Sequence, residues 1–119
     1  MSFIYPQVLE LENKQKVGSK QCVALIQRYT PSVGHTSLWE EGDAVFGNMT
    51  IAPGTAIATF VCGHYPCLPH GNHAAYYLRQ TSNSIYVMDQ WADDTKKPWI
   101  STCIIYLKGN TKLSNGWWP

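Results

Sequence analysis

A cysteine near the start of a predicted helix, Cys22, has the setting that nucleophilic catalysis by a thiol requires. Ser19 can act as the N-cap of this helix, because its hydroxyl accepts hydrogen bonds from the free amides of the first turn. Cys22 then falls in the first turn, where the helix dipole and the unpaired amides favour a thiolate, and Lys20 adds a positive charge. The thiolate is the nucleophilic form of cysteine. The alternative is a core cysteine on an amphipathic helix.

A thiol nucleophile also needs a base and a group that holds the base, and three residues near a predicted hairpin are candidates. His73 begins one predicted strand, and Asp89 and Gln90 end the next one, after a turn at residues 81–84. In an antiparallel hairpin the start of the first strand lies beside the end of the second. We therefore expect Asp89 to orient the His73 ring, with Gln90 as the alternative third residue, and His73 to deprotonate Cys22. Ordinary strand-end roles are the alternatives for His73 and Asp89.

The elements that would position this trio are readable from the spacing of apolar residues. Leu25 and Ile26 lie on one face of the helix, which must end before Pro31 because proline excludes helical geometry at the preceding residue. The backbone amide of Cys22, with the side chain of Gln21, is then placed to stabilise an oxyanion.

The remainder of the chain predicts a small antiparallel sheet. A short helix signal covers residues 3–14, in which Val8, Leu9 and Leu11 are expected to turn inward. The pattern changes to that of strands after residue 42. Helices followed by four to five antiparallel strands predict an α+β fold in a single domain over residues 1–119. The predicted strands cover residues 44–46, 55–61, 73–78, 85–91 and 100–107.

A cluster of cysteines and histidines offers a competing interpretation. Five such residues lie between positions 62 and 73, and their types are those of tetrahedral zinc sites. They are Cys62, His64, Cys67, His70 and His73. Cys62 and Cys67 are also a possible disulfide that closes a short loop, or a pair of free thiols. A zinc site would leave Cys22 and Asp89 without a role.

Composition limits the classes of partner. The chain has 119 residues with 45 % hydrophobic and 14 % charged residues, which is the balance of a globular domain. Its formal charge of +1 argues against nucleic acid as the main partner. Residues 1–6 lack the basic start and apolar run of a signal peptide, and no stretch is long enough for membrane insertion. We therefore expect synthesis in the cytoplasm and export, if any, without a cleaved leader.

Four segments, in this order, resemble the NlpC/P60 and CHAP branch of the papain-like cysteine peptidases. Within that branch the finer match is to small peptidoglycan amidase effectors delivered by type VI secretion. The resemblance covers roughly residues 15–107. The segments are KQCVAL at 20–25, GTAIATF at 54–60, GNHAA at 71–75 and VMDQW at 87–91.

The resemblance implies a papain-like fold, with Cys22 as nucleophile, His73 as base and Asp89 as the orienting residue, and no cofactor. It implies hydrolysis of amide bonds in the stem peptides of peptidoglycan, and we expect the diaminopimelate–D-alanine cross-link to be the bond cut. The implied partners are the type VI secretion apparatus and a cognate immunity protein, and the implied place of action is the periplasm of target bacteria. A zinc-containing or non-catalytic cell-wall-binding module is the alternative.

Overall fold

The computed structural model describes residues 3–18, 21–34, 51–58, 73–81, 84–90, 99–106 and 114–115. Within these residues, three short helical elements come first, followed by five strands, in the α+β order that the sequence predicts. The helical elements are the 3-10 helix η1 (Val8–Leu11), the α-helix α1 (Cys22–Tyr29) and the 3-10 helix η2 (Pro31–Val33). The strands are β1 (Ala56–Ala58), β2 (Ala74–Gln80), β3 (Ser84–Asp89), β4 (Ser101–Tyr106) and β5 (Ser114–Asn115).

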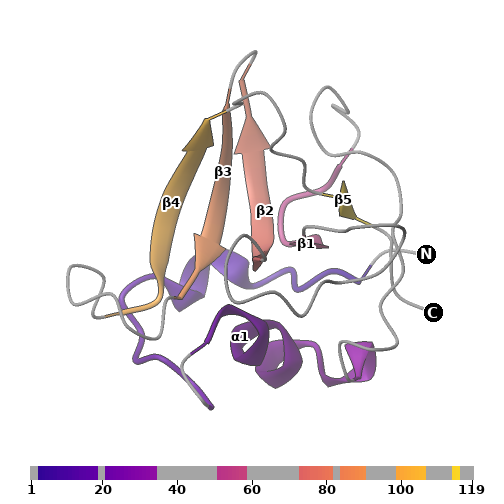
Figure 1. Cartoon of the computed structure of the whole chain (residues 1–119), viewed down its shortest axis with the longest axis vertical. Helices are drawn as coiled ribbons and strands as arrows, with labels where there is room; N and C mark the ends of the chain where they lie inside the picture. The colour runs from indigo at the N-terminus through magenta and orange to yellow at the C-terminus, as the bar shows by residue number, and fades with distance from the viewer. Residues whose placement is uncertain are drawn as a thin grey trace.

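The strands form one antiparallel sheet in the order β4-β3-β2-β1-β5. The strands β2 and β3 form the predicted hairpin, whose turn is closed by a 2.8 Å hydrogen bond from the Thr81 N–H to the Ser84 carbonyl. Because the hairpin is antiparallel, the start of β2 and the end of β3 lie at the same end of the sheet, the end that faces α1 (Figure 1). This end brings together the segments that carry the candidate catalytic residues.

The helix α1 begins one residue after its N-cap, Gln21, and not after Ser19 as the sequence predicts. Gln21 has extended backbone angles, and its carbonyl accepts a 3.1 Å hydrogen bond from the Ala24 N–H. The predicted N-cap is therefore wrong, because the chain is still extended at Gln21. The consequence for Cys22 is small but favourable, since it is the first residue of the helix and lies in the first turn as expected.

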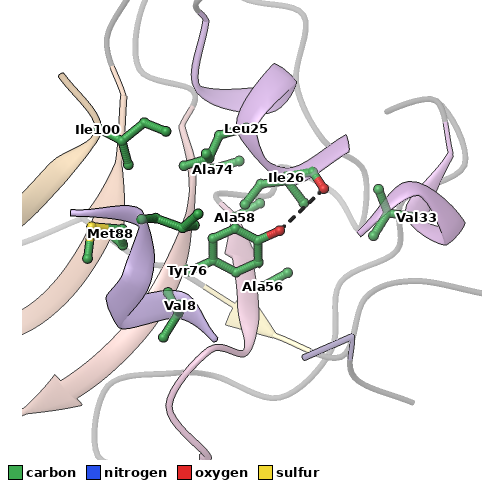
Figure 2. Packing of buried hydrophobic residues seen from close by; sticks show 11 residues of the cluster. Val8, Leu25, Ile26, Val33, Ala56, Ala58, Ala74, Tyr76, Met88 and Ile100 are labelled. Carbon is green, nitrogen blue, oxygen red and sulfur yellow. Dashed lines mark hydrogen bonds between the residues drawn. The ribbon is translucent and has the colours of Figure 1, made fainter. Parts of the chain in front are cut away.

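The face of the sheet toward α1 packs around one tyrosine ring. Three alanines of β1 and β2 leave room for the Tyr76 ring, and the buried Leu25 and Ile26 of α1 complete the cluster (Figure 2). The three alanines are Ala56, Ala58 and Ala74. Small residues on the strands let the helix approach the sheet closely, which fixes the distance between α1 and the start of β2.

The first helical element is a 3-10 helix, and its geometry corrects one prediction about the core. Val8 and Leu11 are buried, but Leu9, which the sequence pattern turns inward, is 71 % exposed. With three residues per turn, positions 8 and 11 fall on the same side and position 9 on another. The predicted strand at 44–46 lies outside the described residues. No helix in the described parts of the chain has the length and apolar character needed to cross a membrane.

Candidate active site

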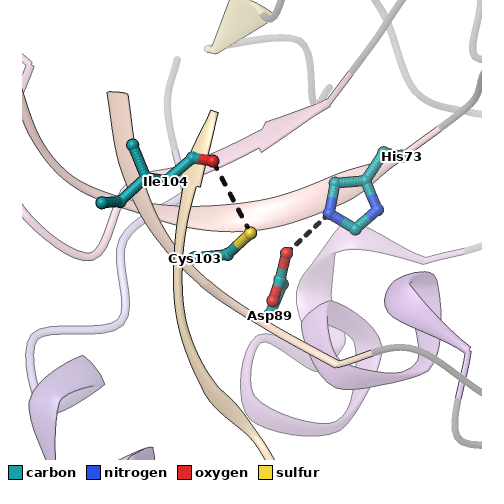
Figure 3. Close-up of polar contacts among 4 residues, drawn as sticks. All are labelled: His73, Asp89, Cys103 and Ile104. Carbon is teal, nitrogen blue, oxygen red and sulfur yellow. Dashed lines mark hydrogen bonds and ion pairs between the residues drawn. The ribbon is translucent and has the colours of Figure 1, made fainter. Parts of the chain in front are cut away.

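A buried histidine–carboxylate pair lies where β2 starts and β3 ends. The Nε2–H of His73 donates to Oδ2 of Asp89 over 2.9 Å (Figure 3). The Asp89 side chain is fully buried, and that of His73 is 11 % exposed. A buried carboxylate is costly unless it is paired and hydrogen-bonded, and the ring supplies that partner.

The hairpin explains why residues that are 16 positions apart in the sequence meet here. His73 immediately precedes β2, and Asp89 is the last residue of β3, where it pairs with Ser101 of β4. The register pairs Tyr76 with Met88, so His73 and Asp89 both fall at the last rungs of the ladder. The sequence prediction that these two residues meet at one end of the sheet is confirmed by the geometry.

The thiol of Cys22 interacts with the same imidazole ring. Burial lowers the pKa of His73, but the hydrogen bonds to Asp89 and Cys22 and the negative charges of both groups outweigh it and raise the pKa from 6.5 to about 9. Cys22 is half-buried at the N-terminus of α1. Nε2 of the ring bonds Asp89, and the other ring nitrogen, Nδ1, is also buried.

The order thiol, imidazole, carboxylate is that of a nucleophile, its base and a group that orients the base. A ring with a pKa of about 9 carries a proton at neutral pH, so a negatively charged sulfur beside it would be stabilised. The structure thus places Cys22, His73 and Asp89 together, as the sequence predicts.

Comparison with known proteins gives the family. The model of the family described as domesticated amidase effector 2 matches residues 7–116. The chain belongs to the domesticated amidase effector 2 family. It is 49 % identical, over 117 residues, to the type VI secretion amidase effector 2 protein of Salmonella typhi, an alignment that covers 98 % of this chain and 84 % of that protein. It also matches a solved structure of a type 6 secretion amidase effector 2 with a TM-score of 0.85 and 49 % identity, covering 91 % of this chain and 77 % of the other.

The two glutamines that the sequence singles out have different positions in this member of the amidase effector 2 family. Gln21 is exposed, and its side chain makes no capping hydrogen bond. Gln90 is fully buried, and its amide bonds the backbone of Val17 and of Gln21 rather than the His73 ring. Sequence reasoning missed these contacts, because they join residues 69 and 73 positions apart in a turn region with no periodic pattern.

The cysteine–histidine cluster falls almost wholly outside the described residues. Cys62 and Cys67, the possible disulfide, lie there, as do the two other zinc candidates His64 and His70. Within the described part of the chain, Cys22 and Cys103 carry reduced thiols. His73, the one described member of the cluster, has its Nε2 bonded to Asp89. The disulfide and the zinc site therefore stay hypotheses from the sequence.

Proposed function

We propose that this protein is a cysteine amidase that hydrolyses amide bonds in the stem peptides of bacterial peptidoglycan, with Cys22 as nucleophile, His73 as base and acid, and Asp89 as the orienting residue. The observation that carries the proposal is the His73 ring itself. It is bonded to Asp89 at 2.9 Å on one side and interacts with Cys22, in a family of amidase effectors. The active unit is one papain-like domain over residues 1–119.

The reaction begins from a thiolate–imidazolium pair. Sγ of Cys22 attacks the carbonyl carbon of the scissile amide, and the C=O electron pair moves to oxygen. The backbone N–H of Cys22, which opens α1, and the exposed side chain of Gln21 stabilise that oxyanion. His73 donates its proton to the leaving amine as the tetrahedral intermediate collapses to a thioester.

The second half of the reaction returns the enzyme to its starting state. The neutral His73 ring takes a proton from water, and the resulting hydroxide attacks the thioester carbon. The C–S bond breaks, the carboxylic acid product leaves, and the thiolate–imidazolium pair is restored. Asp89 keeps Nε2 protonated throughout, so that Nδ1 always faces the sulfur.

The class of substrate comes from the names of the relatives and from the family resemblance. The Salmonella typhi relative is a type VI secretion amidase effector, and we propose the same route of delivery for this chain, with action in the periplasm of target bacteria. We further propose the diaminopimelate–D-alanine cross-link as the bond cut and a cognate immunity protein as partner. These two points rest on the family resemblance, not on a described residue.

Mass spectrometry of muropeptides, released from purified peptidoglycan, tests the proposal and names the bond. The wild-type protein should convert cross-linked dimers to monomers, and Cys22→Ala should lower this rate at least about a thousandfold while the circular dichroism spectrum stays the same. Addition of EDTA to the wild-type assay distinguishes this mechanism from the zinc alternative. A cysteine mechanism does not need metal, so hydrolysis should continue, whereas a zinc protein should lose its structure and activity. Wild-type-like hydrolysis by Cys22→Ala would overturn the mechanism.

A further inference from the structure

The side-chain amide of Gln90 makes three hydrogen bonds to the backbone of the segment that leads into α1. Its Oε1 accepts from the Val17 N–H at 2.9 Å, and its Nε2 donates to the Val17 carbonyl at 3.1 Å and to the Gln21 carbonyl at 2.7 Å. A glutamine amide has two N–H donors, and both are used. The Gln90 side chain is fully buried, so its amide would be costly there without these bonds.

These bonds hold two points of the chain shortly before the nucleophile, Val17 and Gln21. Val17 precedes Gly18, whose φ of +56° favours glycine, and a Cβ at Gly18 would lie 3.1 Å from the Ala24 Cβ on α1. At the second point, Gln21 is the N-cap of α1, and Cys22 follows it directly. Adjacent Cα atoms are about 3.8 Å apart, so a shift at Gln21 passes almost fully to Cys22.

The position of Gln90 in the sequence, directly after Asp89, connects Val17 and Gln21 to the base. In a strand, successive side chains point to opposite faces. Met88 belongs to the cluster under α1, so Asp89, the last residue of β3, lies on the other face. Gln90 directly follows the strand, and its hydrogen bonds place its side chain against Val17 and Gln21. Two consecutive residues therefore act on the two reacting groups. Asp89 ends β3 and holds the His73 ring, and Gln90, the next residue, holds the segment before Cys22.

We propose that Gln90 is a positioning residue that sets the Cys22 sulfur at attacking distance from its base and its substrate. The inference rests on the function proposed above. It replaces the sequence expectation that Gln90 is an alternative orienting group for His73, because the amide is used on the backbone of Val17 and Gln21. A displacement of about 1 Å in a reacting group can cost on the order of a hundredfold in rate, so a backbone anchor next to the nucleophile controls turnover as well as stability.

The test compares Gln90→Met with Tyr76→Phe. Methionine has nearly the length of glutamine but none of its hydrogen bonds, and Tyr76→Phe removes hydrogen bonds at the opposite end of the same helix. Both variants are assayed with soluble muropeptide at a temperature where each is folded by circular dichroism. Gln90→Met should lower kcat at least about tenfold with KM changed less than about twofold, and Tyr76→Phe should keep kcat within about twofold.

A second measurement needs no substrate. The alkylation rate of Cys22 by iodoacetamide, followed at this residue by peptide mapping, should fall in Gln90→Met and shift its pH profile toward that of an ordinary thiol. If wild-type protein hydrolyses nothing but this contrast persists, the proposed reaction fails and the positioning role stands. Equal kcat and equal alkylation in the two variants would overturn the positioning role. Should Gln90→Met not fold, Gln90→Glu, which keeps the acceptor for the Val17 N–H, is judged by the same criteria.

Discussion

The two ends of α1 each bond a buried polar side chain, Tyr76 of β2 and Gln90 directly after β3, but these two anchors have different surroundings. At the C-terminal end, the Tyr76 hydroxyl bonds with Thr30 Oγ1 and donates to the Ile26 carbonyl. At the N-terminal end, the Gln90 amide bonds the Gln21 carbonyl. The Tyr76 anchor lies among tyrosine rings, whereas the Gln90 anchor lies beside the His73–Asp89 pair. Loss of a hydrogen bond is therefore expected to affect packing at the first anchor and catalysis at the second.

The C-terminal anchor, Tyr76, lies in a cluster of aromatic side chains. The Tyr76 ring lies 5.8 Å from that of Tyr5, which in turn lies 5.2 Å from that of Tyr29. Burial raises the pKa of Tyr76 above its ordinary value, so the phenol stays neutral and serves only as a hydrogen-bonding group. Small movements here change core contacts, whereas small movements at the other end change the distance between Cys22 and His73.

The largest effect in this comparison is expected from Asp89→Asn, at the catalytic end. Asparagine has the size of aspartate but lacks the negative charge that helps to keep His73 protonated, so the thiolate–imidazolium pair is less populated. We expect kcat on muropeptides to fall about a hundredfold, with a much smaller loss in Tm. Turnover within about twofold of wild type would remove Asp89 from the mechanism and weaken the contrast between the two ends.

A smaller effect is expected from the pH dependence of wild-type turnover. With a pKa of about 9, His73 carries its proton below pH 9 and loses it above, and the proton that the leaving amine needs is lost with it. The rate should therefore be about tenfold lower at pH 10 than at pH 8. In Asp89→Asn the same decline should begin at lower pH, because a hydrogen bond that raises the pKa of His73 is weakened. If the turnover rate of Asp89→Asn falls over the same alkaline pH range as that of the wild type, a group other than His73 causes the decline.

The sequence predicted much of this arrangement, and the reasons for its failures are physical. Apolar periodicity and the turn at 81–84 were enough to place His73 beside Asp89, because antiparallel pairing fixes which strand ends meet. The start of α1 was misplaced, because a good capping residue at Ser19 says nothing about an extended backbone at Gln21.

The hydrogen bonds of Gln90 could not be predicted from the sequence either. Its partners are backbone groups of Val17 and Gln21, and a backbone group carries no residue-specific signal in the sequence. Gln90 also lies directly after β3, where strand alternation no longer fixes the direction of a side chain. The bond from the Tyr76 hydroxyl to the Ile26 carbonyl is of the same kind, since its acceptor is a backbone group.

The smallest effect is expected from Tyr76→Phe, at the packing end. The Ile26 carbonyl keeps its 2.9 Å hydrogen bond from the Thr30 N–H, so the variant loses a second bond to this acceptor and the bond to Thr30 Oγ1. We expect the free energy of unfolding to fall by about 1 kcal/mol in urea titrations, and kcat to stay within about twofold. Thr30→Val, which removes the other hydroxyl at nearly equal volume, is the matched control and should be no more destabilising. A loss of turnover in Tyr76→Phe equal to that in Gln90→Met would mean that the helix responds as a rigid unit and that its two anchors are equivalent.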